Sequence, residues 1–240
     1  MSENADAAVG RRSGLGGRLR QVRGARGLSV RELARRAGCS ASLLSQVERG
    51  VTTPSAGVVY ALANELGISL DFLFGAEEVV IADLPPMLGS QIPGARPQHH
   101  LNGLRDKTSG SARPTAPWGR ADGPDGSGIV QRASERSTIE LSTGLRWERL
   151  TPTHDSRVDF LDVVYEPGGQ SSETGQAVRH DGREYLRVLT GELEAVIGFE
   201  TLRLVEGDSL AFDPTTPHLY RNPTTKVVRA LSVVVHDPPG

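Results

Sequence analysis

Residues 30–49 read VRELARRAGCSASLLSQVER, a pattern of two short helices joined by a tight turn. Ala34 is small, as the crossing of two helices at close range requires, and Gly38 stands in the turn, where a residue can need a positive φ angle. The apolar residues of this stretch are expected to face one small core, and they are Leu33, Ala37, Cys39, Leu44 and Val47. The stretch therefore predicts a helix-turn-helix unit inside a small bundle.

The helical spacing extends to both sides of this stretch, over residues 14–75. Apolar residues recur at i, i+4 and i+7 in the helix before it, which holds Leu15, Leu19 and Val22. That helix is expected to end near Gly27. A fourth helix follows the quoted stretch, and residues 70–74 form a fifth short turn. We therefore expect a bundle of five helices.

Capping residues mark where three of these helices begin. Ser29 is followed three residues later by Glu32, which is the S-x-x-E form of a capping box. Ser40 is expected to cap the next helix, and Thr53 the helix after it, with Pro54 at its first position. The side-chain oxygen of each capping residue can accept a hydrogen bond from a backbone N–H that the first helical turn leaves without a partner.

The positive charge of the chain is concentrated in its first fifty residues. These residues hold ten Arg and four acidic residues, a balance of +6, whereas the whole chain of 240 residues has a formal net charge of -2. A basic N-terminal segment followed by an acidic remainder indicates a module that binds a polyanion, joined to a part that does not bind nucleic acid.

The helical part resembles the xenobiotic-response-element (XRE) class of regulators and the phage lambda and 434 repressor domains, from about Gly14 through Phe74. The resemblance rests on the quoted stretch, on the G-x-x-L-R before it, on E-R-G at 48–50 and on P-S at 54–55. It implies that the second helix of the motif lies in the major groove of DNA, with its N-terminal half against base edges.

The resemblance also implies roles for single residues. It places base-reading side chains at Ala41, Ser42 and Gln46, and phosphate contacts at Ser40, Ser45 and Arg49. Gln46 is the best base reader, because its amide can form two hydrogen bonds to adenine N6 and N7. Val30 stands where the family often has Gln, so one customary phosphate contact is lost. The resemblance further pairs Arg23 with Glu48 across two helices.

Residues 76–128 differ in composition from both ends of the chain. They hold seven Pro and eight Gly in 53 positions, with no sustained helix or strand period. Such a segment buries too little apolar surface to offset its chain entropy, so we expect a linker that is disordered in its middle, and a disordered tail at residues 1–13. His99 and His100 lie in this linker, and we interpret them as solvated side chains.

From residue 129 to 240 the apolar period changes to two, which predicts short strands. Nine runs fit, at 136–141, 145–150, 157–166, 184–190, 192–198, 201–205, 209–213, 218–222 and 227–236. Turn residues such as those of Pro167-Gly168-Gly169 separate them. Many short strands at this spacing indicate a sandwich or a barrel. The fold class expected for the whole chain is thus α + β, in two domains.

Two stretches of the second domain resemble the signature motifs of the cupin superfamily. They are YEPGGQSSETGQAVRHDGREYLRVLTG at 165–191 and GDSLAFDPTTPHLYRN at 207–222, and the likeness covers about 136–236. It implies a double-stranded β-helix barrel and, in a complete cupin, a divalent metal held by His-x-His, a Glu and a later His. The first of those histidines falls on Val178 here, which leaves three possible ligands: His180, Glu184 and His218.

The three remaining ligands leave more than one reading open. Two His and one carboxylate suit Fe(II), and Zn, Mn, Ni or Co are also chemically possible. The same residues can bind a polar small molecule with Tyr220 and Asn222 at the rim, or be hydrogen-bonded core residues. We expect the three to meet from two neighbouring parts of the sheet. Solvent-facing positions are expected to alternate with them, at Asp181, Arg183 and Arg187.

The order of the two domains resembles that of bacterial helix-turn-helix cupin regulators, including polyamine-pathway repressors. This favours a sequence-specific transcriptional regulator that binds a double-stranded DNA operator as a homodimer and senses a small-molecule effector or a metal. The alternative is an enzyme with a mononuclear non-haem iron site, because hydroxypropylphosphonate epoxidase has the same domain order and the same His-x3-Glu plus later His pattern. The arginine-rich motif with its intact turn favours DNA.

Other features exclude several classes of protein. No apolar run approaches the roughly 20 residues that span a bilayer, and the first residues lack the apolar segment of a secretory signal. The single cysteine, Cys39, cannot form an internal disulfide or a Cys-based zinc site. No Walker or dinucleotide-binding glycine loop is present in the sequence. We expect a cytoplasmic protein with no membrane partner.

Overall fold

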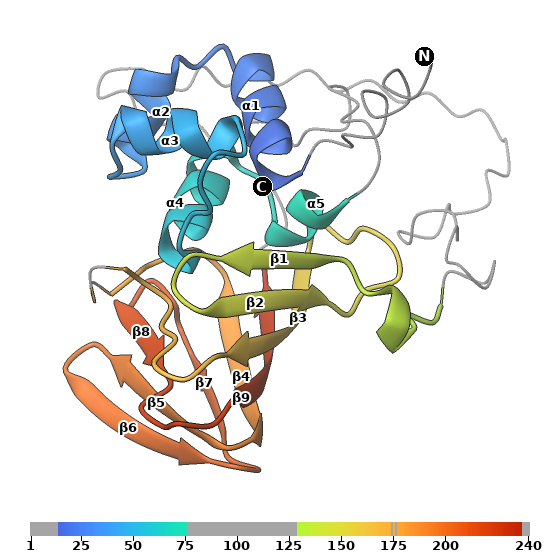
Figure 1. The fold of residues 1–240 in the computed structure, drawn as a ribbon, viewed down its shortest axis with the longest axis vertical. Helices are drawn as coiled ribbons and strands as arrows, with labels where there is room; N and C mark the ends of the chain where they lie inside the picture. Colours follow the sequence, from blue (N-terminus) through green and yellow to red (C-terminus); the bar gives the residue numbers. More distant parts are fainter. Residues whose placement is uncertain (1–13, 76–128, 174, 176, 237–240) are drawn as a thin grey trace, which may run out of the picture.

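The computed structural model describes residues 14–75, 129–173, 175 and 177–236, which form a helical domain and a β domain in contact (Figure 1). The predicted tail at 1–13 and the predicted linker at 76–128, with His99 and His100, lie outside the described residues. Within the described ranges, no helix is both long enough and apolar enough to cross a membrane.

The helical domain contains the five expected helices. They are α1 (Leu15–Ala25), α2 (Val30–Arg36), α3 (Ala41–Glu48), α4 (Ala56–Leu66) and α5 (Leu70–Phe74). The hydroxyl of Ser29 accepts a hydrogen bond from the backbone N–H of Glu32, and the hydroxyl of Ser40 caps α3 in the same way. Gly38 has a φ of 68°, so the turn between α2 and α3 uses the left-handed region that glycine tolerates. The predicted turn and these two caps are confirmed.

Helix α4 begins later than predicted. Its N-cap is Ser55, whose hydroxyl accepts from the N–H of Val58, and not Thr53. Pro54 lies before the helix, and its carbonyl accepts a hydrogen bond from the N–H of Ser142 in the β domain at 3.1 Å. The hydroxyl of Ser55, two residues further along the chain, therefore takes the capping role expected for Thr53.

An ion pair joins α1 to α3, as predicted. Arg23 Nε lies 2.6 Å from Glu48 Oε1, Arg23 Nη2 lies 2.9 Å from Glu48 Oε2, and Nη1 donates to the carbonyl of Leu28. The side chains are 14% and 5% exposed. The hydrogen bonds to Glu48 raise the pKa of Arg23 despite the opposing effect of its burial. This two-bond pair fixes how α3 sits on the bundle.

The β domain contains nine strands, each within two residues of its predicted ends. They are β1 (Thr138–Leu141), β2 (Leu145–Arg149), β3 (Val158–Tyr165), β4 (Arg183–Thr190), β5 (Glu192–Ile197), β6 (Glu200–Val205), β7 (Ser209–Phe212), β8 (His218–Arg221) and β9 (Val228–Val235). They form a six-stranded sheet in the order β1-β2-β3-β9-β4-β7 and a three-stranded sheet in the order β6-β5-β8. The two sheets enclose the domain's core (Figure 1).

Strand β4 shows how the sequence sorts side chains between core and solvent. Glu184, Leu186 and Val188 are buried, while Arg183 and Arg187 are exposed, as is Asp181 before the strand. The predicted alternation is therefore confirmed, and it places the carboxylate of Glu184 in the interior of the domain.

Helices α4 and α5 lie against the β domain (Figure 1). Asp71 of α5 is fully buried, and its carboxylate accepts a hydrogen bond from the N–H of Asp155 and lies 2.8 Å from His154 Nδ1. Its own N–H donates to the carboxylate of Asp159 at 2.8 Å. Gly57 of α4 donates its N–H to the carbonyl of Ser171, which lies in the loop after β3. No pattern in the sequence predicts this direct docking.

Candidate functional site

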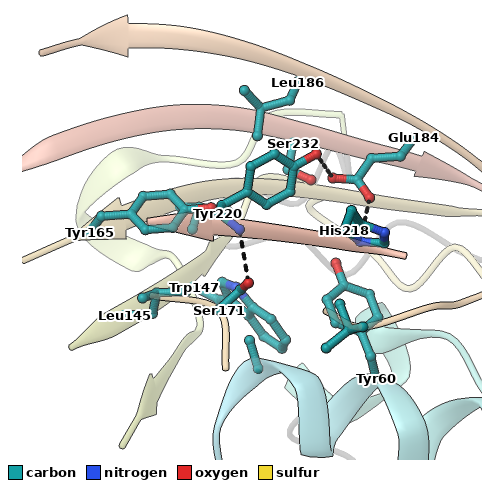
Figure 2. Close-up of a pocket in the computed structure, with 13 residues that line it drawn as sticks. Tyr60, Leu145, Trp147, Tyr165, Ser171, Glu184, Leu186, His218, Tyr220 and Ser232 are labelled. Carbon is teal, nitrogen blue, oxygen red and sulfur yellow. Dashed lines mark hydrogen bonds and ion pairs between the residues drawn. The ribbon is translucent and has the colours of Figure 1, made fainter. Parts of the chain in front are cut away.

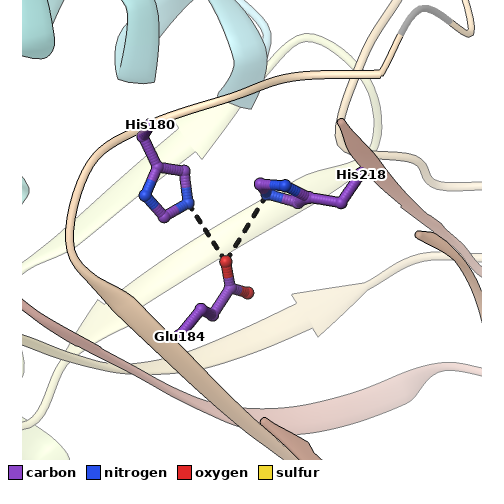
Figure 3. Close-up of side chains that lie close together, drawn as sticks. All are labelled: His180, Glu184 and His218. Carbon is purple, nitrogen blue, oxygen red and sulfur yellow. Dashed lines mark hydrogen bonds and ion pairs between the residues drawn. The ribbon is translucent and has the colours of Figure 1, made fainter. Parts of the chain in front are cut away.

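The three predicted ligand residues come together inside the β domain (Figure 3). Glu184 lies on β4 of the six-stranded sheet, His218 on β8 of the three-stranded sheet, and His180 in the segment before β4. One ligand atom from each residue lies within 4.8 Å of the others. Convergence was expected from neighbouring parts of one sheet, and that expectation is wrong: the residues meet across the interior from two sheets, because β4 and β8 face each other and are not paired.

The carboxylate of Glu184 is the centre of the cluster. Its Oε2 lies 3.0 Å from His180 Nε2 and 3.5 Å from His218 Nε2. The exposed fractions of the three side chains are between 2% and 5%. A carboxylate removed from water to this degree requires partners of opposite charge or hydrogen-bond donors.

The backbone sets the orientation of both imidazole rings. Nδ1 of His180 lies 3.0 Å from the carbonyl oxygen of Asp181, and Nδ1 of His218 lies 3.0 Å from that of Thr216. A carbonyl oxygen only accepts, so Nδ1 is the donor in each of these two contacts. A hydrogen bond from Nε2 to Glu184 then requires a proton on Nε2 as well, whereas coordination of a metal requires the Nε2 lone pair. Both Nε2 atoms face the same oxygen of Glu184. The arrangement thus directs three electron-pair donors toward one point.

His218 is held in its neutral form. Burial lowers its pKa, and neighbouring His180 lowers it further, which together outweigh the attraction of Glu184 and the hydrogen bond to Thr216. At pH 7 the His218 ring therefore offers a lone pair and carries no charge. This is the form in which histidine binds a metal.

Tyr220 of β8 holds the second oxygen of Glu184. Its hydroxyl donates to Oε1 at 2.9 Å, and burial, reinforced by the charge of Glu184, raises its pKa well above the ordinary value. The phenol therefore stays protonated and fixes the carboxylate plane. Asn222 lies elsewhere, and its expected place at the rim is corrected. Its amide donates to three backbone carbonyls, those of Tyr165, Glu166 and Lys226, so it holds a turn.

A small pocket adjoins the cluster (Figure 2). Its volume is about 20 Å³, and its lining comes from both sheets and from α4. Tyr60 of α4 stacks on His180 with ring centroids 4.5 Å apart and an interplanar angle of 8°, and it meets the edge of Trp147 at 5.4 Å. The helical domain therefore supplies one wall of a pocket that lies in the β domain.

Tyr60, Trp147 and Ser171 are pocket residues that sequence reasoning missed. Tyr60 and Trp147 occupy apolar positions of a helix and a strand, and a buried aromatic residue in such a place is more often core than site. The one available signal was the hydroxyl of Tyr60 on an otherwise apolar helix face, since a buried hydroxyl needs a partner.

The residues expected to contact DNA lie on or beside α3. Ser40, Ser42 and Arg49 are exposed, and Ala41, Ser45 and Gln46 are half-buried, while Leu44 and Val47 point into the bundle. Helix α3 lies on the side of the helical domain away from the β sheets (Figure 1). This face of α3 is thus partly open to solvent.

Comparison with known proteins identifies both domains. Residues 19–73 match the helix-turn-helix family, and residues 161–234 match the cupin domain family. The chain is 23% identical over 218 residues to the HTH-type transcriptional regulator PuuR of Escherichia coli K12, which covers 90% of this chain and 92% of that protein.

Two further likenesses are to a second regulator and to a solved structure. The chain is 36% identical over 102 residues to the HTH-type transcriptional regulator DdrOP3 of Deinococcus deserti, covering 42% of this chain and 71% of that protein. Among solved structures, an HTH_3 family transcriptional regulator from Vibrio cholerae superposes with a TM-score of 0.57 at 19% identity, over 95% of this chain and 97% of that one. That superposition shows the same two-domain fold.

Proposed function

Because this chain belongs to the XRE-type helix-turn-helix transcriptional regulators and carries a cupin domain, we propose that α3 reads an operator and that the buried triad is the sensing site. The observation that supports the sensing role is the convergence of His180, Glu184 and His218 inside the barrel. The two functions lie in different domains that touch through α4 and α5.

On the DNA side, α3 enters the major groove. Gln46 hydrogen-bonds a base edge, and Ala41 and Ser42 contact neighbouring bases. Ser40, Ser45 and Arg49 contact phosphates, and these contacts set the register without choosing the sequence. A homodimer places two copies of α3 on half-sites about one helical turn (~34 Å) apart. The Arg23 pair with Glu48 keeps α3 at a fixed angle to the rest of the bundle.

On the sensing side, the triad binds one divalent metal ion. The ligands are Nε2 of His180, Nε2 of His218 and the carboxylate of Glu184, whose lone pairs already point toward one another. Two His and one carboxylate leave coordination positions open, and they suit Fe(II), with Zn, Mn and Ni as other candidates. An ion held by these three residues would supply Lewis-acid chemistry, with room for an oxygen or nitrogen ligand from an effector.

The effector is a small molecule, and it switches DNA binding only if it has different affinities for the DNA-competent and incompetent states. An enzyme with a mononuclear metal site is the second candidate, because the same triad supports it. The exposed α3 face, with its flanking arginines, favours the regulator, since catalysis has no use for it.

Random-sequence DNA selection with the full-length protein tests the DNA role. We expect a two-fold symmetric motif for the wild type, and for Gln46→Ala a relaxed preference at one or two base pairs, at a cost of roughly 1–3 kcal/mol. The control is Arg49→Ala, which should weaken binding to all sequences alike. Identical motifs from the wild type and Gln46→Ala would show that α3 does not read bases through this residue.

Titration with Co(II) tests the metal role separately. We expect one ion per chain for the wild type, and loss of that ion in His218→Ala with the fold intact by circular dichroism. If His218→Ala binds Co(II) as the wild type does, the ion site lies elsewhere. The two tests are independent, so one role can fail without the other.

A further inference from the structure

The pocket beside the triad is much smaller than an organic molecule. Its volume of about 20 Å³ is enough for one water molecule or one metal ion. Pockets that bury organic ligands have volumes of roughly 300–1,000 Å³. An organic effector therefore fits only after one wall of the pocket has moved.

The walls differ in how firmly they are held. Trp147 and Glu184 belong to strands whose backbones are hydrogen-bonded on both sides within the six-stranded sheet. Ala56 and Tyr60 belong to α4, which is part of the other domain. Moving a sheet strand breaks many backbone hydrogen bonds, whereas moving α4 separates two packed surfaces and breaks the single backbone hydrogen bond from Gly57 to the carbonyl of Ser171. The α4 wall is therefore the one that yields.

The contact between α4 and the barrel depends on a glycine and on the valine at the altered motif position. A Cβ atom on Gly57 would lie 2.5 Å from Cγ1 of Val178, so this close approach requires glycine. Val178 stands where the cupin motif would have its first histidine, and it lines the pocket. The side chain at this position is apolar, and α4 packs against it. This observation is independent of the pocket volume and points to the same helix.

We propose that α4 is the lid of the sensor pocket, and that an organic effector displaces it. The effector class is a small molecule with one polar group, which reaches the triad, and an apolar body, which packs on Trp147 where Tyr60 now lies. Occupancy of the pocket and docking of the helical domain on the barrel then exclude each other. The sensing role rests on the proposed function, whereas the lid itself rests on geometry alone.

This arrangement explains how a buried site is coupled to α3. Tyr60 lies in the same five-helix bundle as the recognition helix, and the bundle is held to the barrel through α4 and through the buried contacts of Asp71. When Tyr60 leaves His180, the bundle loses its stacking contact and changes its position on the barrel. A metal ion alone fits the pocket and leaves α4 in place.

A reversible disulfide between α4 and the barrel tests the lid. A Cβ atom on Gly57 lies 3.9 Å from Cβ of Ser172, inside the range of about 3.5–4.5 Å that a disulfide spans. The test protein is the full chain with Gly57→Cys and Ser172→Cys, with Val178→Ala to remove the close methyl group. Cys39→Ser prevents a disulfide between Cys39 and either new cysteine. Trp118→Phe leaves Trp147 as the only tryptophan in the sequence. The reduced form of the same protein is the matched control.

The probe is acrylamide, a small polar amide that quenches tryptophan fluorescence on contact. We expect the quenching constant of Trp147 to be at least about threefold lower in the oxidised form than in the reduced form, because only the reduced form opens. Tyr60→Ala without the cysteine pair should raise the constant above that of Tyr60→Phe, which keeps the ring. Equal quenching in the oxidised and reduced forms, or in the two Tyr60 variants, would overturn the lid.

Co(II) binding to the same two forms separates this inference from the proposed function. The lid predicts that Co(II) alone binds the oxidised and reduced forms equally, and that 2-picolinate joins the bound ion only in the reduced form. Formation of that ternary complex in the oxidised form would contradict the lid. Absence of Co(II) binding in both forms would refute the metal site and leave the quenching result as the test of the lid.

Discussion

Helix α3 and the barrel interior both carry polar side chains, and they hold them in opposite ways. On α3, Ser42 and Arg49 are exposed, so their polar groups are presented to an outside partner. In the barrel, His180, Glu184 and His218 are buried, and both rings are fixed by backbone carbonyls. The two proposed functions fit this difference: side chains that adjust suit a surface that reads DNA, whereas ligands placed in advance suit an ion site. The contacts of α4 and α5 with the β domain connect the domain that carries α3 to the domain that carries the triad.

The largest expected effect is on the metal affinity of the buried triad. Glu184→Gln removes the only negative charge of the triad, and we expect divalent metal affinity to fall by at least about 100-fold. Isothermal titration with Co(II) measures it. Tyr220→Phe should cost less, about 10-fold, because it removes only the bond that orients the carboxylate.

Glu206→Gln is the control for this comparison, because Glu206 is exposed and lies outside the triad. Its metal affinity should equal that of the wild type. If Glu184→Gln also retains wild-type affinity, the buried cluster is a hydrogen-bonded core and not an ion site.

The next effect concerns the contact between the two regions. Asp71→Asn keeps the shape of the side chain but replaces one acceptor oxygen with a donor NH2 group, which leaves partly buried donors of the β domain without an acceptor. We expect the free energy of unfolding to fall by about 2 kcal/mol, measured in urea. Trp147 should also become more accessible to acrylamide, because α5 and α4 are docked together.

Unchanged unfolding and unchanged quenching in Asp71→Asn would mean that this contact does not hold the domains together. Asp208→Asn, at an exposed position of the turn before β7, is the matched control for a change from Asp to Asn.

A smaller effect is expected inside the helical domain. Arg23→Met strands the carboxylate of Glu48, and we expect a loss of about 1–2 kcal/mol of stability, less than for a fully buried pair because Arg23 is partly exposed. A double-mutant cycle with Glu48→Gln isolates the pairing energy. A coupling indistinguishable from zero would show that packing alone fixes α3. The exposed pair of Arg35 and Glu32 serves as the reference with a weaker coupling.

The smallest effect is a pH dependence at the edge of the domain contact. Burial lowers the pKa of His236, but the hydrogen bond and charge of Asp159, helped by Asp181 and Asp155, outweigh it and raise the pKa above 6.5. The stabilisation is therefore present below about pH 6.5 and is lost as the pH rises through the raised value. Unfolding in urea between about pH 6 and 8 should show a larger loss of stability with rising pH for the wild type than for His236→Gln. An equal pH dependence of the free energy of unfolding in the two proteins would show that His236 does not contribute to the stability of this contact.

The sequence predicted what depends on neighbours along the chain. The turn at Gly38 and the cap at Ser40 follow from local rules, and all nine strands follow from period-two patterns. The pair of Arg23 with Glu48 joins distant residues, and it followed from the family resemblance. These are the features that short spacings and shared motifs encode.

What the sequence left open depends on how the two domains meet. Tyr60 and His180 are 120 positions apart, and neither carries a pattern that links it to the other. Asn222 belongs to the motif but serves a backbone turn, since an amide in a motif can serve a ligand or the fold equally well. Such contacts are decided by packing between domains, which periodicity does not record.

Metal analysis and genomic DNA selection on one full-length sample test most directly whether a single chain joins a DNA-reading helix to a buried ion site. We expect a defined palindromic site to be enriched and about one divalent ion to be bound per chain. Stoichiometric metal without sequence enrichment would contradict the regulator and support a metal enzyme, and an enriched site without any bound ion would contradict the metal-binding role of His180, Glu184 and His218.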